Sequence, residues 1–179
     1  MKIKTTMTIL VLALLAVATP LSAQDFSNMD ASPMDAASFP SSYRVSDKLI
    51  KIVYSRPQLK GRDLASLAPA GKVWRTGANE AAELTLYVDM KVGGKTVKAG
   101  TYSFFTIPGE KEWTAIISKD VNVWGAYSYN EANDVARVSV PVSTGDSLEA
   151  FSIAFTESDN GVDMNLGWGT VRVKVPFTK

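Results

Sequence analysis

Side chains able to hold an anionic or sugar-like ligand are concentrated in residues 54–80 of this chain. Arginine binds carboxylate, sulfate or phosphate through paired hydrogen bonds, and aromatic rings beside polar groups stack on flat ligand faces. Glycine and proline fix the intervening backbone, which favours a structured loop. With a second loop-like stretch further on, the predicted ligand-binding residues are Arg56, Arg62, Trp74, Arg75, Asn79, Glu80, Trp124, Tyr127, Asp134 and Arg137.

A purely structural role for the arginines is the alternative. Arg56 and Arg75 would then bond carbonyl groups of their own loop, or would pair with Glu80 and Asp134. In that case the polar stretch would stabilise the fold and leave no charge for a ligand. The sequence leaves both interpretations open.

The four tryptophans separate into two groups. Trp113 and Trp168 lie in segments of alternating polarity and are predicted to be core residues. Trp74 could stack on a ligand, but the favoured interpretation is that it plugs one end of the core at the start of a strand. For Trp124 the two roles are equally open, and Tyr127 lies close to it in the sequence.

The chain contains no histidine and no cysteine. Catalytic triads with histidine, cysteine nucleophiles and zinc sites of His and Cys are therefore excluded. No cofactor and no bound metal ion are predicted. The remaining enzymatic alternative is a carboxylate-based glycoside hydrolase, with Glu80 and Asp134 as its two carboxyl groups. If the strand has already begun at Glu80, Glu83 is a poor partner for it, because an odd separation along a strand directs side chains to opposite faces.

Residues 1–23 are typical of a secretory signal peptide. Lys2 and Lys4 precede an apolar run over residues 9–18, and a small residue, Ala23, ends the segment. The run is shorter than the roughly 20 residues of a membrane span, so no membrane insertion is expected after its removal. The mature protein is predicted to be periplasmic or secreted, with an exported linker over residues 24–42.

The net charge of the chain indicates which classes of binding partner to expect. The formal net charge of the whole chain is +1. Nucleic-acid-binding domains carry a strongly basic surface, so no nucleic-acid partner is predicted. The expected partner is a small molecule or a glycan.

The remaining residues, 43–179, are predicted to form a single all-β domain. Short runs of alternating polarity follow one another every 8–12 residues or so, with turn signals such as Gly93-Gly94 and Pro108-Gly109 between them. This pattern indicates an antiparallel, jelly-roll-like β-sandwich. Two long connections interrupt it, the first over residues 55–79 and the second over residues 119–134. Long connections in compact domains are often functional, and we expect these two to pack together at one end.

The chain also resembles a bacterial family, the domain of unknown function 2911, over residues 32–177. The resemblance rests on Tyr54-Ser-Arg-Pro, Lys60-Gly-Arg, Gly71-Lys-Val-Trp-Arg-Thr-Gly-Ala-Asn-Glu, Ala99-Gly-Thr-Tyr-Ser-Phe-Phe-Thr-Ile-Pro-Gly, Glu112-Trp, Trp124-Gly and Asp134-Val-Ala-Arg. The chain departs from the family where Ala70 follows Pro69, since the family tends to have an aromatic residue there. The resemblance implies an exported all-β domain and no established activity.

Three hypotheses follow from these observations. The leading one is a non-catalytic module that binds a glycan or an anionic small molecule. The second is an envelope protein whose polar loop is structural or binds a protein partner. The third is the hydrolase that uses Glu80 and Asp134.

Overall fold

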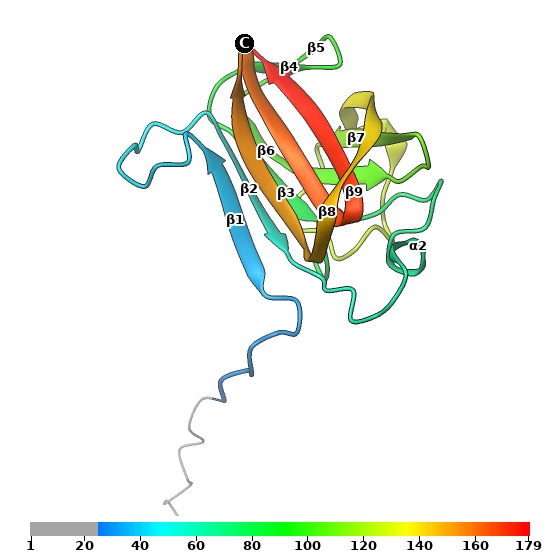
Figure 1. Cartoon of the computed structure of the whole chain (residues 1–179). Helices are drawn as coiled ribbons and strands as arrows, with labels where there is room; N and C mark the ends of the chain where they lie inside the picture. The colour runs from blue at the N-terminus through cyan, green and yellow to red at the C-terminus, as the bar shows by residue number, and fades with distance from the viewer. Residues whose placement is uncertain (1–24) are drawn as a thin grey trace, which may run out of the picture.

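The computed structural model describes residues 25–179, and the predicted signal peptide lies outside the described residues. This part of the chain is almost entirely antiparallel β-structure (Figure 1). Its elements are β1 (Met34–Phe39), β2 (Ile50–Ser55), α2 (Leu64–Leu67), β3 (Ala82–Leu86), β4 (Met90–Val92), β5 (Lys95–Val97), β6 (Gly100–Ile107), β7 (Glu112–Ser118), the 3-10 turn η1 (Glu131–Asn133), β8 (Asp134–Ser158) and β9 (Gly161–Thr178). The predicted all-β antiparallel class is confirmed.

Alternating polarity explains why these segments are strands. In β2 the side chains of Ile50, Ile52 and Tyr54 are buried, and in β3 those of Leu84 and Leu86 are buried. Successive strand residues point to opposite faces, so each strand turns one apolar face to the core. The short helix α2 interrupts the first connection.

The predicted Gly93-Gly94 hairpin joins β4 and β5. Val92 pairs with Lys95, and the two glycines have φ values of +55° and +79°. Positive φ at both central positions gives a turn whose twist matches that of the flanking strands, and glycine adopts it without a Cβ clash.

The strands form one nine-stranded sheet in the order β1-β2-β3-β6-β7-β8-β9-β4-β5, where two separate sheets of a sandwich were expected. The difference arises in β8, which is one strand of 25 residues. Its first part pairs with β7 and its later part pairs with β9, with register shifts between Thr144 and Leu148 and between Leu148 and Ser152. Irregularities of this kind bend a strand and increase its twist, so β8 carries the sheet round without breaking it.

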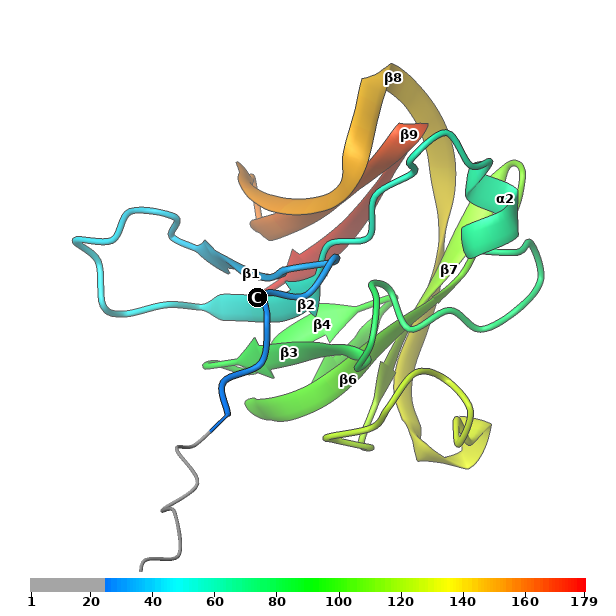
Figure 2. The ribbon, with the colours of Figure 1, turned by 90° about the horizontal axis from the view of Figure 1, so that it is seen from below.

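The main core lies between the two parts of this curled sheet (Figure 2). The ring of Tyr54 on β2 meets Phe151 on β8 edge to face, with 5.6 Å between centroids. The Tyr54 hydroxyl accepts a 2.8 Å hydrogen bond from the backbone N–H of Ile153. These contacts join segments about a hundred residues apart, so the curled form is held by side chains as well as by strand pairing.

Part of the expected linker is structured. Residues Met34–Phe39 form β1, the edge strand that pairs with all of β2. The linker therefore does not extend over these residues, although their sequence, MDAASF, shows no regular alternation of polarity. Edge strands have one unpaired side and bury few side chains, so they show little apolar alternation.

A membrane-spanning helix is not found among residues 25–179.

Candidate functional site

The two long connections meet as predicted. The backbone N–H of Gly125 donates to the carbonyl of Asn79 at 3.0 Å, and that of Ala81 donates to Val123 at 3.0 Å. Glu80 and Trp124 form an antiparallel bridge between these bonds. We call residues 79–81 and 123–125 the loop junction. It brings both stretches of predicted ligand-binding residues to one region of the surface.

The backbone that leads to the loop junction is unusual. Thr76 and Asn79 have φ values of 52° and 61°. Asparagine tolerates the left-handed region, but a β-branched residue there is an outlier. The Thr76 hydroxyl lies 3.1 Å from that of Thr106, and both residues are fully buried. Such conformations persist only where the surrounding structure imposes them, so this segment is held in one shape.

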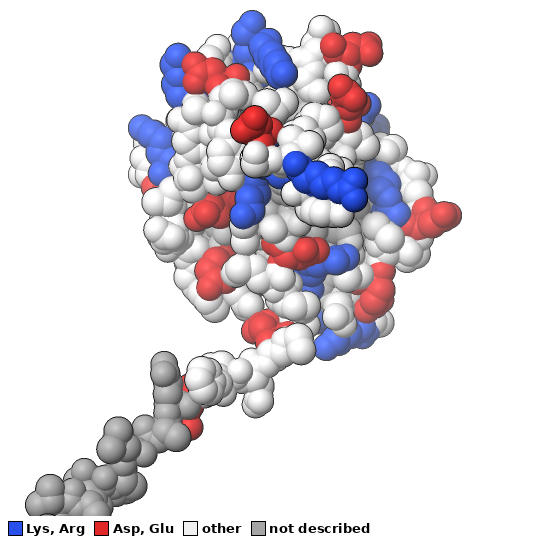
Figure 3. Space-filling model, turned by 90° about the vertical axis from the view of Figure 1, so that its left-hand side faces the viewer, with Lys and Arg blue, Asp and Glu red and all other residues white. Residues whose placement is uncertain are grey.

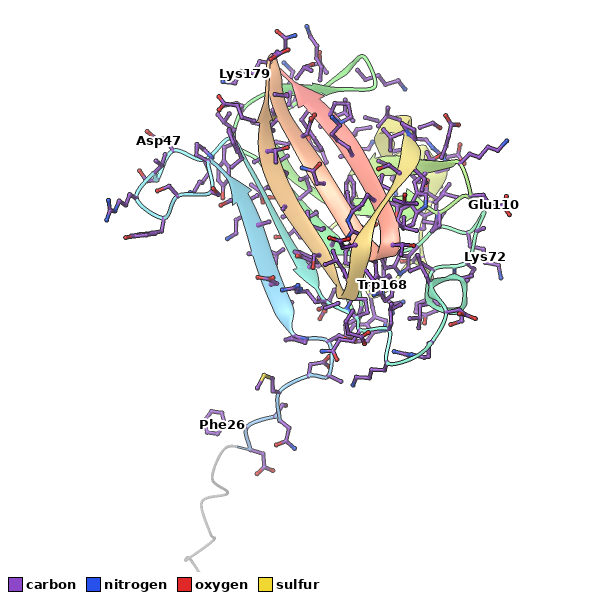
Figure 4. The ribbon with its side chains drawn as sticks, viewed as in Figure 1. Phe26, Asp47, Lys72, Glu110, Trp168 and Lys179 are labelled. Carbon is purple, nitrogen blue, oxygen red and sulfur yellow. The ribbon has the colours of Figure 1, made fainter. Side chains whose placement is uncertain are left out.

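Trp74 points into the core, as the favoured interpretation predicted. Its side chain is buried, and it stacks on Trp168 with 5.5 Å between centroids and meets Trp113 and Phe151 edge to face. Trp168 lies at the end of the molecule opposite Lys179 (Figure 4). Trp113 and Trp168 are themselves buried, which confirms their predicted place in the core. The role of Trp74 is thus to close this end of the core.

Arg75 lies on the opposite face of the chain from Trp74. Because Trp74 bridges Thr106 antiparallel, the next residue, Arg75, lies opposite Phe105 on the outer face of β6. Arg75 lines a cavity of about 400 Å³ together with Lys72 and Tyr127, and the rest of its lining comes mainly from residues 66–74. We call this cavity the Arg75 groove. Lys72 lies on the loop that follows α2 (Figure 4).

The Arg75 guanidinium has no protein partner among residues 25–179. Its Nε atom is buried and makes no hydrogen bond, and no carboxylate lies within ion-pair distance of its other nitrogens. Buried polar groups are nearly always paired in folded proteins, so each exception calls for an explanation. Within the described chain Nη1 and Nη2 also make no hydrogen bond and are not fully enclosed, so an anion in the groove would supply acceptors for them.

Arg56 has a different environment, which matches the structural alternative. Its guanidinium donates to the carbonyl of Phe151 at 3.0 Å, to Asp35 at 3.0 Å and to the Ser152 hydroxyl at 2.7 Å. These bonds tie β1 and the first connection to β8. All three nitrogens of Arg56 are therefore used within the protein.

Arg62 also bonds its own loop. Its Nε donates to the carbonyl of Leu59 at 2.9 Å, and Nη2 donates to that of Gln58 at 2.8 Å. The residue is exposed and lies outside the lining of the Arg75 groove. Of the arginines in the first connection, Arg75 alone among the described residues is left without such bonds.

We expect Arg56→Ala to lower the free energy of unfolding by about 1–2 kcal/mol. Hydrogen bonds to charged groups contribute roughly 1.5–3 kcal/mol each when buried, and the partial exposure of Arg56 reduces this. Chemical denaturation of the purified protein measures the change. Arg62→Ala is the matched control and should stay within about 0.5 kcal/mol of the wild type. Equal stability of both variants would contradict the structural role of Arg56.

Asp134 and Arg137 form a network beneath the second connection. Arg137 Nη1 lies 2.8 Å from a Glu131 carboxylate oxygen and 3.3 Å from Asp134 Oδ2. The Tyr129 hydroxyl donates to the same Asp134 oxygen at 2.6 Å. The Asp134 side chain is only 7% exposed and neither residue lines the groove, so their predicted ligand contacts are replaced by internal ones.

Burial dominates the electrostatics of this network. It raises the pKa of Asp134, while the hydrogen bond from Tyr129 and the charge of Arg137 oppose the rise. Burial, together with the bond to Asp134, raises the pKa of the Tyr129 hydroxyl far above its ordinary value. Asp134 Oδ1 is buried without a partner. The network therefore holds the second connection in place.

A second apolar layer explains why that connection is ordered. Phe105 on β6 and Ile116 on β7 are paired residues of the outer face, and both are fully buried. The Tyr129 ring packs edge to face on Phe105 at 5.2 Å, so the second connection covers this face (Figure 2). Sequence analysis missed this layer. Its signal was the adjacent apolar pairs Phe104-Phe105 and Ile116-Ile117, which indicate burial on both faces of a strand.

The aromatic side chains expected to stack on a ligand are exposed. Trp124, at the loop junction, is 61% exposed, and Tyr127, on the wall of the Arg75 groove, is 86% exposed. Exposed apolar groups are informative where they lie together, and these two aromatic residues are three positions apart in the second connection. Tyr127 shares one groove with Arg75, whereas Trp124 is not part of the lining and Asn79 supplies a backbone carbonyl to the junction.

Glu80 and Asp134 do not share a cavity. Glu80 is exposed and lines a separate pocket together with Glu83, whereas Asp134 lies under the second connection. The geometry thus argues against the Glu80–Asp134 hydrolase. The argument against Glu83 as the partner of Glu80 applies only within a strand. β3 begins at Ala82, so its alternation does not extend to Glu80, and both glutamates line one pocket.

Charges of both signs are interspersed over the side of the molecule on which β1 lies (Figure 3). This face shows no cluster of cations of the kind that binds a nucleic-acid backbone.

The family model described as "Protein of unknown function (DUF2911)" matches residues 32–177. No curated protein and no solved structure matches the chain.

Proposed function

For this chain, which belongs to the DUF2911 family of proteins of unknown function, we propose the role of an exported module that binds an acidic carbohydrate in the Arg75 groove. The observation that carries the proposal is the guanidinium of Arg75, which lines the groove and has no protein partner in the described part of the chain. A carboxylate is the natural complement of a guanidinium, because two parallel hydrogen bonds form at once. Lys72 adds a second positive charge to the same lining.

The exposed aromatic side chains favour a ligand that contains a ring. Tyr127 is exposed on the groove wall and Trp124 is exposed at the loop junction beside it. An aromatic ring placed in water without a packing partner offers a flat apolar face to a sugar ring. A uronic acid combines such a face with a carboxylate, so one ligand would satisfy both features.

Preorganisation strengthens the case for binding. The segment that carries Arg75 has left-handed residues on its C-terminal side and is bonded through Thr76 to the core. A rigid binding group loses little conformational entropy when a ligand arrives, which favours affinity.

The structural role of the loop remains the second candidate. Arg56, Arg62 and Arg137 all make internal bonds, as an envelope protein with a purely architectural loop would require. Under this alternative Arg75→Ala would lower the melting temperature and would affect no ligand. Under the binding proposal the same variant stays folded and loses affinity.

Isothermal titration of the purified protein with trigalacturonate, and with galactotriose as its neutral counterpart, tests the proposal. We expect binding of the acidic sugar only, weakened by salt because the groove is open to solvent. Arg75→Ala should reduce the affinity about ten- to a hundredfold, since a charged hydrogen bond contributes roughly 1.5–3 kcal/mol. Arg62→Ala is the matched control and should bind like the wild type. Equal affinity of Arg75→Ala and wild type would refute the proposal.

A further inference from the structure

A second pocket of opposite character lies on the other side of the loop junction. Its volume is about 240 Å³, and its lining includes Glu80, Glu83, Ser55, Ser103 and Asn122. We call it the glutamate pocket. At one end of the loop junction, Asn79 bonds Gly125, whose neighbour in the chain, Ala126, lines the Arg75 groove. At the other end, Ala81 bonds Val123 and itself lines this pocket. The two cavities are thus separate.

Strand register places the polar groups of the pocket. Val53 on β2, Glu83 on β3 and Ser103 on β6 are consecutive partners across the sheet. Directly paired residues of neighbouring strands point to the same face, so these three form one row on the outer face. Glu80 joins them from the loop junction, which the bridge to Trp124 fixes in position.

The two carboxylates have no cation. Within residues 25–179 neither Glu80 nor Glu83 makes an ion pair, and no side chain donates a hydrogen bond to either of them. Two like charges in one pocket repel each other, so an outside cation would be attracted.

Two hydroxyl groups of the lining point to the same conclusion. Ser55 and Ser103 line the pocket and are only 4% and 3% exposed. Neither hydroxyl takes part in a side-chain hydrogen bond within the described chain, and neither oxygen is fully enclosed, so both are accessible from the pocket. A ligand with several N–H donors would give partners to both the carboxylates and the hydroxyls.

The rest of the lining favours an organic cation over a metal ion. Met34, Val53 and Ala81 contribute aliphatic surface. A calcium ion takes six to eight oxygen ligands, and no group of three or more acidic residues with suitable spacing occurs among the described residues. A primary ammonium group has three N–H donors and a carbon stem, which matches two acceptor groups beside an aliphatic wall.

We propose that the glutamate pocket binds the primary ammonium group of a small aliphatic amine, with Glu80 and Glu83 as its counter-ions. The alkyl stem lies against Val53 and Met34. This inference is independent of the acidic-sugar proposal, because no residue lines both cavities.

The test is a titration of the full protein with cadaverine, followed by calorimetry and by the NMR signal of the Met34 methyl group. Met34 lines the pocket, so its signal reports binding at this place. We expect cadaverine to shift that signal, and the neutral analogue 1,5-pentanediol to leave it unchanged. Glu83→Gln and Glu80→Gln should each weaken cadaverine binding about tenfold, because each removes one charge and keeps the shape of the side chain.

Glu112→Gln is the matched control, since it removes one exposed glutamate charge that lines none of these cavities. It should bind cadaverine like the wild type, and all three variants should keep the wild-type melting curve. Three results would overturn the proposal: no shift of the Met34 signal, equal loss of affinity in Glu112→Gln, or a shift produced by CaCl₂ but not by cadaverine.

Discussion

Trp74→Ala should lower the free energy of unfolding by about 3–5 kcal/mol, the usual cost of removing a large buried aromatic side chain. Trp74 is 5% exposed, and it contacts Trp113, Phe151 and Trp168 with centroid distances of 5.0–6.0 Å. The cavity would lie among three large rings, which cannot collapse into it without leaving their own positions. Urea denaturation followed by circular dichroism measures the loss.

Trp124→Ala is the control for this prediction. Trp124 is 61% exposed, and truncation of an exposed side chain usually changes stability by less than about 0.5 kcal/mol. If both tryptophan variants unfold at the same urea concentration, the assignment of Trp74 to the core is wrong. If Trp124→Ala is the less stable protein, the loop junction is a structural element and the stacking role fails.

Gly77→Ala should both destabilise the protein and impair the Arg75 groove. A Cβ atom at Gly77 would lie 2.9 Å from the backbone oxygen of Ser55, and this oxygen belongs to β2 and cannot move aside. The segment that carries Arg75 must shift instead. Overpacking of this kind costs about 1–3 kcal/mol. We also expect more than a tenfold loss of affinity for trigalacturonate, measured by calorimetry.

Gly94→Ala provides the comparison. Gly94 has a φ value of +79° in the β4–β5 hairpin, and a Cβ atom there meets nothing within 4 Å. The left-handed conformation of the new alanine should lower the free energy of unfolding by roughly 1–2 kcal/mol. The affinity for trigalacturonate should not change. Comparable loss of affinity in both glycine variants would mean that general destabilisation, and not the position of Arg75, explains the effect.

The site contains groups of both charges in a small area. Arg75 and Lys72 line one cavity, and Glu80 and Glu83 line the other, on the two sides of the loop junction. Because the cationic and the acidic side chains line separate cavities, they do not form ion pairs with each other. The arrangement suits a protein that holds one ligand group of each sign at defined positions.

Local signals in the sequence determined the class of fold and several of its details. Alternation in β2 and β3 marked their inward faces, because a strand with one buried face must repeat every two residues. Gly93-Gly94 determined its hairpin, since only glycine takes positive φ twice in succession at little cost. The buried positions of Trp74, Trp113 and Trp168 followed from the same strand patterns. These features depend on neighbours within a few residues.

The tertiary structure alone decided which polar residues remain available. Arg56, Arg62 and Arg75 look equivalent in the sequence, yet two of them bond protein carbonyls and the third lines an open groove. Likewise, Glu80 shares a pocket with Glu83 and not with Asp134, because the bridge to Trp124 and the register of β3 place the two glutamates there. Whether a guanidinium or a carboxylate is available for a ligand depends on its hydrogen-bond and ion-pair partners in the protein. Those partners come from segments far away in the chain.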